Sequence, residues 1–200
     1  MVVVAVVWQP TLLDLEAPSL DPSAPVSRTW LDDRCWVDIA VGFLRSSGSL
    51  FDQLAEGLAW RQRRRVVWEK EHLEPRLTSG GLPLPLPGVL EEARALLSAR
   101  YGVDFDACSA NLYRDGRDSV AWHRDRVHRV QRDPLVVTLS LGHRRPFLAR
   151  PHGGGPSTRF DPGDGDLLVM GGSCQHLWEH TVPKVASAGP RISVMLRTSR

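Results

Sequence analysis

Residues 135–141 of this protein read LVVTLSL, and residues 191–197 read RISVMLR. Both are short runs typical of β-strands. Three similar runs lie in the same half of the chain, so the candidate strands are residues 108–113, 135–141, 146–150, 166–170 and 191–197. Turn sequences separate them: DG at 115–116, GGG at 153–155 and DPGDG at 161–165. Several short strands joined by such turns predict a β-sandwich or barrel.

The first half of the chain shows helical patterns instead. Residues 47–60 and 88–101 each carry apolar side chains at helical spacing, and Gly102 is placed to end the second helix. Residues 2–7 form a β-branched run that could make a strand, whereas residues 9–33 are rich in proline and acidic residues and are predicted to be irregular. The chain is therefore predicted to be an α+β protein, with supporting helices first and a jelly roll after them.

The composition excludes several classes of protein. The chain has 200 residues and a formal net charge of +2, so it is not a polybasic protein that coats any polyanion. A 42% apolar fraction and seven tryptophans exclude a disordered chain, and the length suits one domain. No apolar segment is long enough to span a membrane. Three scattered cysteines argue against a disulfide framework and predict a reducing, cytoplasmic location.

Arginine supplies 23 of the 25 basic residues, and lysine occurs only as Lys70 and Lys184. One interpretation is that most of these arginines are solvated surface residues. The other is that some serve as the planar fork with which a guanidinium binds two oxygens at once. Arginines gather at residues 61–65 and 114–132, where they could form a rim that binds nucleic-acid phosphates.

A candidate metal site begins with His123-Arg124-Asp125, the one His-x-Asp tripeptide in the chain. On an extended segment, residues two apart point to the same face, so His123 and Asp125 could bind one ion. The third ligand would come from a distant segment, and the candidates are His176 and His180. Two histidines and one carboxylate form the facial set that leaves open positions on Fe(II) for a cosubstrate and O₂.

Two arginines in the last candidate strand suit a dicarboxylate ligand. Arg191 and Arg197 lie six residues apart, an even spacing that puts both side chains on one face of a strand. A dicarboxylate needs charged, bidentate partners, and arginine supplies them better than lysine. The pair therefore predicts a face that binds a small dianion.

Five segments in order carry a family resemblance. They read NLYRDG at 111–116, WHRD at 122–125, GDLLVMGG at 165–172, HTVPK at 180–184 and GPRISVMLR at 189–197, with a weaker similarity in PRLT at 75–78. Together they resemble the AlkB family, the Fe(II)/2-oxoglutarate-dependent dioxygenases that remove alkyl groups from nucleic-acid bases. Five motifs in the right order are far more specific than any one of them.

The resemblance implies a fold and a metal site. The fold would be a double-stranded β-helix, in which residues 1–88 form an N-terminal extension and substrate-lid region. Residues 89–200 would form the supporting helix and the catalytic core of one dioxygenase domain that spans the whole chain. By position in the motifs, the resemblance implies His123, Asp125 and His180 as the catalytic iron ligands.

The resemblance also implies the cosubstrate contacts and the reaction. Asn111 and Tyr113 would contact 2-oxoglutarate, Arg191 would clamp its distal carboxylate, and Arg197 would lie near the end that chelates iron. With Fe(II), 2-oxoglutarate and O₂, the enzyme would dealkylate N-alkylated bases in DNA or RNA. Nucleic acid is therefore the expected partner, with no membrane association, and the protein is expected to be a monomer.

Two departures from the family pattern concern the substrate. Many members have a second acidic residue two positions after the ligand aspartate, where this chain has Val127. Members that act on nucleic acid often have an aromatic residue soon after PRLT, where this chain has Ser79-Gly80-Gly81. A milder difference is Ser193, at a position where Asn is common. An alternative is therefore the same oxidative chemistry on a protein, lipid or small molecule.

A second alternative is a zinc hydrolase or a non-catalytic binding module. Residues 176–180 read HLWEH, which matches the inverted zinc-protease pattern H-x-x-E-H, in which one helix presents both histidines. Two glycines precede this segment and Pro183 follows it, so no long helix fits there. Cys174 could also join His176 and His180 in a structural zinc site, but the paired Cys spacing typical of such sites is absent.

Overall fold

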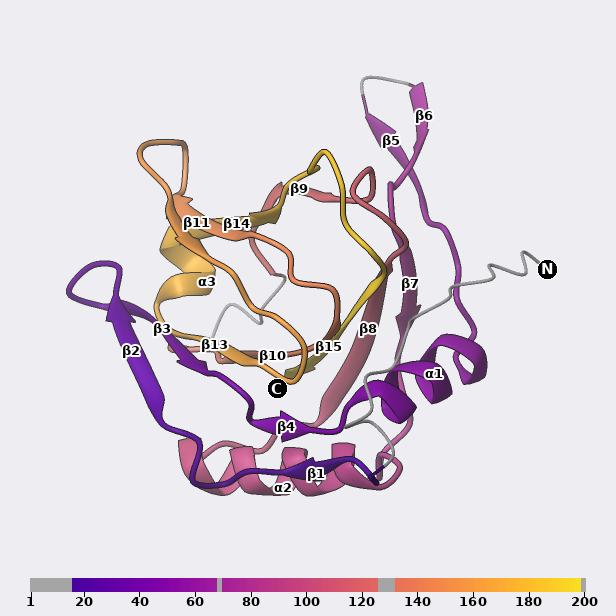
Figure 1. Cartoon of the computed structure of the whole chain (residues 1–200). Coiled ribbons are helices and arrows are strands. Elements are labelled where there is room, and N and C mark those ends of the chain that lie inside the picture. The colour runs from indigo at the N-terminus through magenta and orange to yellow at the C-terminus, as the bar shows by residue number, and fades with distance from the viewer. Residues whose placement is uncertain (1–15, 68–69, 126–131, 199–200) are drawn as a thin grey trace.

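The computed structural model describes residues 16–67, 70–125 and 132–198, and two of its antiparallel sheets face each other (Figure 1). The larger sheet has the strand order β2 (Val26–Trp30), β3 (Cys35–Ala40), β13 (Leu167–Gly172), β10 (Val136–Gly142), β15 (Arg191–Arg197), β8 (Ala107–Tyr113), β7 (Leu77–Gly80). The smaller sheet has the order β12 (Thr158–Phe160), β11 (Phe147–Pro151), β14 (Trp178–Val182), β9 (Val120–His123). The predicted jelly-roll core is confirmed.

Helices and two short strand pairs complete the described structure. The pairs are β1 (Ser19–Leu20) with β4 (Leu44–Arg45), and β5 (Arg64–Val67) with β6 (Lys70–Leu73). The helices are α1 (Gly48–Gly57), α2 (Val89–Tyr101) and α3 (Cys174–Leu177). Figure 1 shows α1 and α2 outside the larger sheet and the β5–β6 hairpin projecting away from the barrel.

The strand β15 lies between β10 and β8, and its side chains alternate between two environments. Ile192, Val194 and Leu196 pack into the apolar core that the sheet shares with α1 and α2. Arg191 and Arg197 line the pocket between the sheets, which agrees with their even spacing. The pleat therefore puts apolar residues against the helices and polar residues toward the pocket.

The two predicted helices form because each has one apolar face and a defined end. Leu50 and Leu54 of α1, and Leu90 and Leu97 of α2, are buried against the larger sheet. As predicted, α2 ends at Gly102, which has a φ of +67° and whose N–H donates to the Ser98 carbonyl.

The predicted order, with helices first and strands after them, is wrong. The strands β2 and β3 precede both helices and belong to the larger sheet, where β3 pairs with β13 along its whole length. The part of residues 9–33 that the structure describes also contains β1 and β2, so it is not irregular throughout. Four of the five side chains of β2 are exposed, so this edge strand lacks the apolar alternation that marks a strand in a sequence. The candidate strand at residues 2–7 lies outside the described residues.

The three cysteine thiols are free and buried, as expected for a chain without a disulfide framework. Among the described residues, no helix has both the length and the apolar character needed to cross a membrane.

Candidate active site

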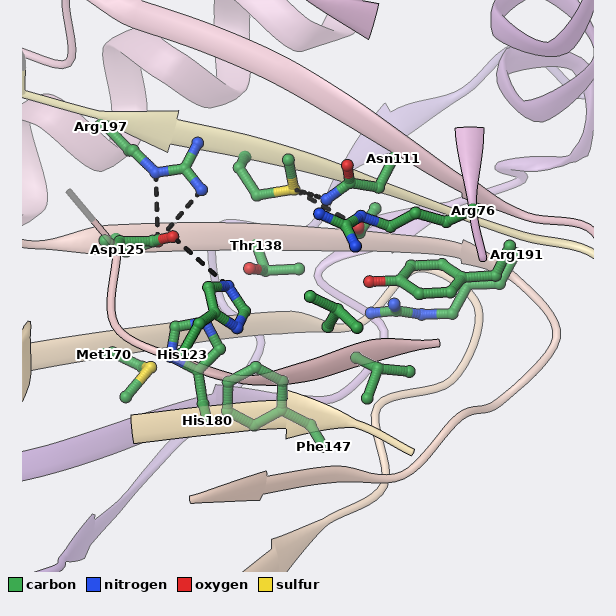
Figure 2. Close-up of a pocket in the computed structure, with 16 residues that line it drawn as sticks. Arg76, Asn111, His123, Asp125, Thr138, Phe147, Met170, His180, Arg191 and Arg197 are labelled. Atoms are coloured by element: carbon green, nitrogen blue, oxygen red, sulfur yellow. Dashed lines mark hydrogen bonds and ion pairs between the residues drawn. The ribbon is translucent and has the colours of Figure 1, made fainter. Parts of the chain in front are cut away.

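A pocket between the two sheets collects the residues singled out in the sequence. Its walls include Asn111 and Tyr113 from β8, and Arg191 and Arg197 from β15. The smaller sheet contributes the candidate metal ligands from β9 and β14, and Asp125 follows β9 by two residues. Figure 2 shows the two histidines and Asp125 together, with the side chain of Arg191 reaching toward them from the opposite side of the pocket.

The candidate ligand atoms of His123, Asp125 and His180 all lie within 4.8 Å of one another. The register of β9 against β14 pairs His123 directly with His180, and the ring centroids are 4.3 Å apart. Nε2 of His123 lies 3.8 Å from Oδ1 of Asp125. In the part of the chain that the structure describes, this is the one group of three such side chains close enough to hold an ion.

The electrostatic surroundings of Asp125 and His180 suit a divalent cation. Burial lowers the pKa of His180 to about 4, so its imidazole is neutral and able to donate a lone pair at neutral pH. Burial alone would raise the pKa of the Asp125 carboxyl, but the guanidinium of Arg197 holds it below its ordinary value. Nδ1 of His180 is buried and has no hydrogen-bond partner among the described residues. Two imidazole nitrogens and a carboxylate fit Fe(II).

Arg197 orients the carboxylate of this group. Its Nε and Nη2 donate to Oδ2 of Asp125 at 3.1 and 3.0 Å, and its Nη1 donates to Ser109 Oγ at 2.9 Å. The other carboxylate oxygen, Oδ1, faces His123. The family resemblance implies that Arg197 lies near the end of 2-oxoglutarate that chelates iron, and in the structure its guanidinium contacts Asp125, a candidate metal ligand.

Arg191 is buried, with 2% of its surface exposed, and no described carboxylate pairs with it. Its Nε and Nη2 donate to Ser140 Oγ at 3.1 and 2.7 Å, and its guanidinium carbon lies 5.4 Å from the centre of the Tyr113 ring. Burial lowers its pKa to about 10, so the side chain is still charged at neutral pH. A buried cation without an anion is costly, so this position is suited to an anionic ligand.

The two predicted β8 residues also lie in the pocket, because β8 pairs with β15. The register sets Tyr113 opposite Arg191 and Asn111 opposite Ser193. Tyr113 is buried, and Nδ2 of Asn111 donates to Met195 Sδ at 3.5 Å. All seven candidate site residues therefore line a single pocket.

Several residues that line the pocket were not predicted from the sequence to be site residues. Phe147 of β11 stacks on His180 with the ring centroids 5.1 Å apart, and Thr138 of β10 lines the pocket from the larger sheet. Arg76 also lines the pocket, with its Nη2 3.1 Å from Oε2 of Glu74. In the sequence, only the PRLT similarity at residues 75–78 pointed to Arg76 as a site residue. Phe147 and Thr138 reach the pocket through the pairing of their strands with distant strands, which no local pattern indicates.

Trp60 and Trp122, whose rings could in principle stack on a base, do not line this pocket. Trp60 packs against the main core and donates to the carbonyls of Leu54 and Ala55 at 3.2 and 3.0 Å. Trp122 lies under the guanidinium of Arg150, whose carbon is 4.0 Å from a Trp122 ring centroid. Trp68 lies outside the described residues, as does Val127.

The histidine pair of the zinc-protease pattern is not presented by one helix. His176 belongs to α3, which has four residues, whereas His180 belongs to the strand β14. Glu179 is not part of the candidate metal group. Its carboxylate instead accepts a hydrogen bond from Nε of Arg150 at 2.6 Å. The third member of the candidate metal group is therefore His180.

Comparison with known proteins agrees with this geometry. A sequence model of the 2OG-Fe(II) oxygenase superfamily matches residues 51–200. The chain belongs to this superfamily. Its cofactor and cosubstrates, as the superfamily implies, are Fe(II), 2-oxoglutarate and O₂, and the His-Asp-His group fits that metal.

Curated relatives place the oxygenase within the AlkB family, as predicted. It is 32% identical over 216 residues to alpha-ketoglutarate-dependent dioxygenase alkB homolog 3 of Homo sapiens, covering 95% of this chain and 73% of the relative. The bovine homolog 3 is 34% identical over 178 residues, covering 78% of this chain. The match spans 62% of the bovine protein's length.

Solved structures support the fold assignment. The structure of OsALKBH1 superimposes with a TM-score of 0.64 at 14% identity, covering 86% of this chain and 100% of the other. A prolyl hydroxylase from Trichoplax adhaerens superimposes with a TM-score of 0.60 at 13% identity, covering 82% of this oxygenase and 83% of the hydroxylase. The double-stranded β-helix is thereby confirmed.

Proposed function

We propose that this oxygenase removes alkyl groups from N-alkylated bases in DNA or RNA. The observation that carries the proposal is the pocket itself, where a His-Asp-His group lies beside a buried arginine that has no described carboxylate partner. The same chain is related to alkB homolog 3 and, at 26% identity over 234 residues, to DNA oxidative demethylase ALKBH2 of Arabidopsis thaliana.

In this proposal, His123, Asp125 and His180 hold Fe(II), and Arg197 keeps the Asp125 carboxylate in place. When bound, the metal and 2-oxoglutarate together supply the oxidising power that hydroxylates the alkyl carbon with O₂. The hydroxylated carbon then leaves the base nitrogen as an aldehyde, while 2-oxoglutarate ends as succinate and CO₂.

The remaining polar residues of the pocket would bind 2-oxoglutarate. Arg191 would clamp the distal carboxylate, since its guanidinium is buried and already oriented by Ser140. Asn111 and Tyr113 would contact the cosubstrate from β8. The alkylated base would have to leave its stack to reach a pocket enclosed by two sheets.

The test is turnover of an oligonucleotide that carries 1-methyladenine or 3-methylcytosine. With Fe(II) and 2-oxoglutarate, we expect formaldehyde and succinate to form in equal amounts with loss of the methyl group. An unmethylated oligonucleotide is the control. Succinate release without demethylation would favour the alternative of a protein or small-molecule substrate, and no succinate under any condition would refute the proposed chemistry.

We further propose that exposed arginines near the β5–β6 hairpin bind nucleic-acid phosphates. Within the described residues, Arg61 and Arg63 are exposed and have no ion pair with a carboxylate. Two members of the other arginine cluster are already paired, since Arg114 binds Asp118 and Arg117 binds Asp115. The proposed phosphate contacts are therefore Arg61 and Arg63, which precede the hairpin.

Replacing both Arg61 and Arg63 by Gln should weaken binding to single-stranded DNA whatever its sequence. Two phosphate contacts would be lost, so the slope of log affinity against log salt should fall by about 1.4. Fluorescence anisotropy at several salt concentrations measures this slope. Arg159→Gln, which removes an exposed arginine paired with Asp161, is the matched control. An unchanged slope in the double variant would contradict the assignment.

We also propose that residues 1–200 form one dioxygenase domain that acts as a monomer in the cytoplasm. Strands on both sides of residue 88 hydrogen-bond into the same sheet, which supports one domain. The buried free thiols of Cys35, Cys108 and Cys174 are compatible with a reducing compartment. Size-exclusion chromatography with light scattering measures the oligomeric state.

A further inference from the structure

The short helix α3 lies against the segment that carries two of the proposed metal ligands. Two hydrogen bonds join them. The main-chain N–H of Asp125 donates to Oε1 of Gln175 at 3.2 Å, and Nη1 of Arg124 donates to the His176 carbonyl at 2.8 Å. The first of these bonds joins a buried side chain to the backbone of a metal ligand.

Gln175 is only 2% exposed, and both ends of its amide are used. Its Oε1 accepts from Asp125, and its Nε2 donates to Met170 Sδ at 3.6 Å. Met170 lines the pocket. Because a thioether sulfur only accepts hydrogen bonds, this contact keeps the amide oxygen turned toward Asp125.

Asp125 needs such support because it lies beyond the end of its strand. The strand β9 ends at His123, and its pairing with β14 ends with the His123–His180 pair. Arg197 holds Oδ2 of the carboxylate, which restrains the side chain but not the main chain. Gln175 restrains the main chain. Together, the contacts from Arg197 and Gln175 hold the carboxylate with Oδ1 facing His123.

We propose that Gln175 is a positioning residue that sets the Asp125 carboxylate for metal binding. This inference rests on the proposed iron site. Residues that orient metal ligands typically change metal affinity by about 10- to 100-fold when they are replaced. Gln175→Met keeps the length of the side chain but leaves the Asp125 N–H without its acceptor, so it should weaken divalent-metal binding by about tenfold or more.

The experiment measures Mn(II) binding to the metal-free protein by isothermal titration calorimetry, without turnover. The wild type is compared with Gln175→Met and with Gln175→Glu, which retains an oxygen able to accept from Asp125. The matched control is Ser173→Ala, which alters the residue that precedes the same helix and whose side chain contacts Asp133 instead. The expected result is weak binding in Gln175→Met and near wild-type binding in the other two variants.

The thermal midpoint of each metal-free variant separates loss of positioning from loss of folding. If Gln175→Met does not fold, Gln175→Asn supplies the same test, because its amide is one methylene too short to reach Asp125. Wild-type Mn(II) affinity in a folded Gln175→Met or Gln175→Asn variant would overturn this inference alone. Weak binding in a folded Gln175→Glu variant would also overturn it. Failure of the wild type to bind Mn(II), or unchanged binding in His123→Ala, would instead refute the metal site itself and this inference with it.

Discussion

Replacing His123 by Ala should reduce turnover at least about a thousandfold and abolish measurable iron binding at micromolar metal. The imidazole is one of three donors whose atoms lie within 4.8 Å of one another, so its loss leaves only two ligands. His123 is the best of the three to replace, because 32% of its side chain is exposed and its removal leaves no sealed cavity. Metal titration of the purified variant, together with succinate formation, measures both effects.

The matched control for this variant is His152→Ala. His152 is also a half-exposed histidine near a carboxylate, since its Nδ1 lies 3.5 Å from Oε2 of Glu179, but it is not among the pocket-lining residues. The control should keep nearly wild-type metal binding and turnover. Iron binding of wild-type strength in His123→Ala would show that the ion is held elsewhere.

Replacing Arg191 by Met should raise the KM for 2-oxoglutarate by about a hundredfold or more, with a smaller fall in kcat at saturation. A charge-assisted bidentate contact to a carboxylate in a buried site would be lost, and such contacts are worth about 2–5 kcal/mol when one partner is removed. Steady-state kinetics at several 2-oxoglutarate concentrations separates the two constants. Arg191→Lys should recover only part of the loss, because an ammonium lacks the planar fork.

Stability of the metal-free protein provides a second measure for Arg191→Met. The guanidinium is buried without a described carboxylate partner, so an apolar side chain of similar length should leave the free energy of unfolding unchanged or higher. The wild type, in contrast, should gain more stability than the variant when 2-oxoglutarate is added with Mn(II). Arg159→Met, at an exposed ion pair with Asp161, is the control and should behave as the wild type. Equal stabilisation of the variant and the wild type would contradict the clamp.

Much of the site could be predicted from local pattern. On β15, the two-residue period puts Ile192, Val194 and Leu196 on the helix side and both arginines on the pocket side. This feature follows from the geometry of an extended backbone, and so it can be read from spacing alone. The same rule predicted that His123 and Asp125 could bind one ion, although Asp125 lies two residues beyond the end of β9.

Other parts of the molecule depend on contacts between distant segments. Spacing left His176 and His180 both open as the third ligand, and the pairing of β9 with β14 places His180 beside His123. The edge strand β2 escaped prediction because its exposed side chains have no apolar period, while its backbone is held by β3.

The same division explains the role inferred for Gln175. The residues next to Gln175 in the sequence do not indicate this role, because its hydrogen-bond partner Asp125 lies 50 residues away. Likewise, the sequence identified Arg191 as a guanidinium suited to a dicarboxylate, but its burial and its lack of a described anionic partner depend on packing between two sheets. Local periodicity decides which face a side chain occupies, and long-range strand pairing decides which side chains meet there.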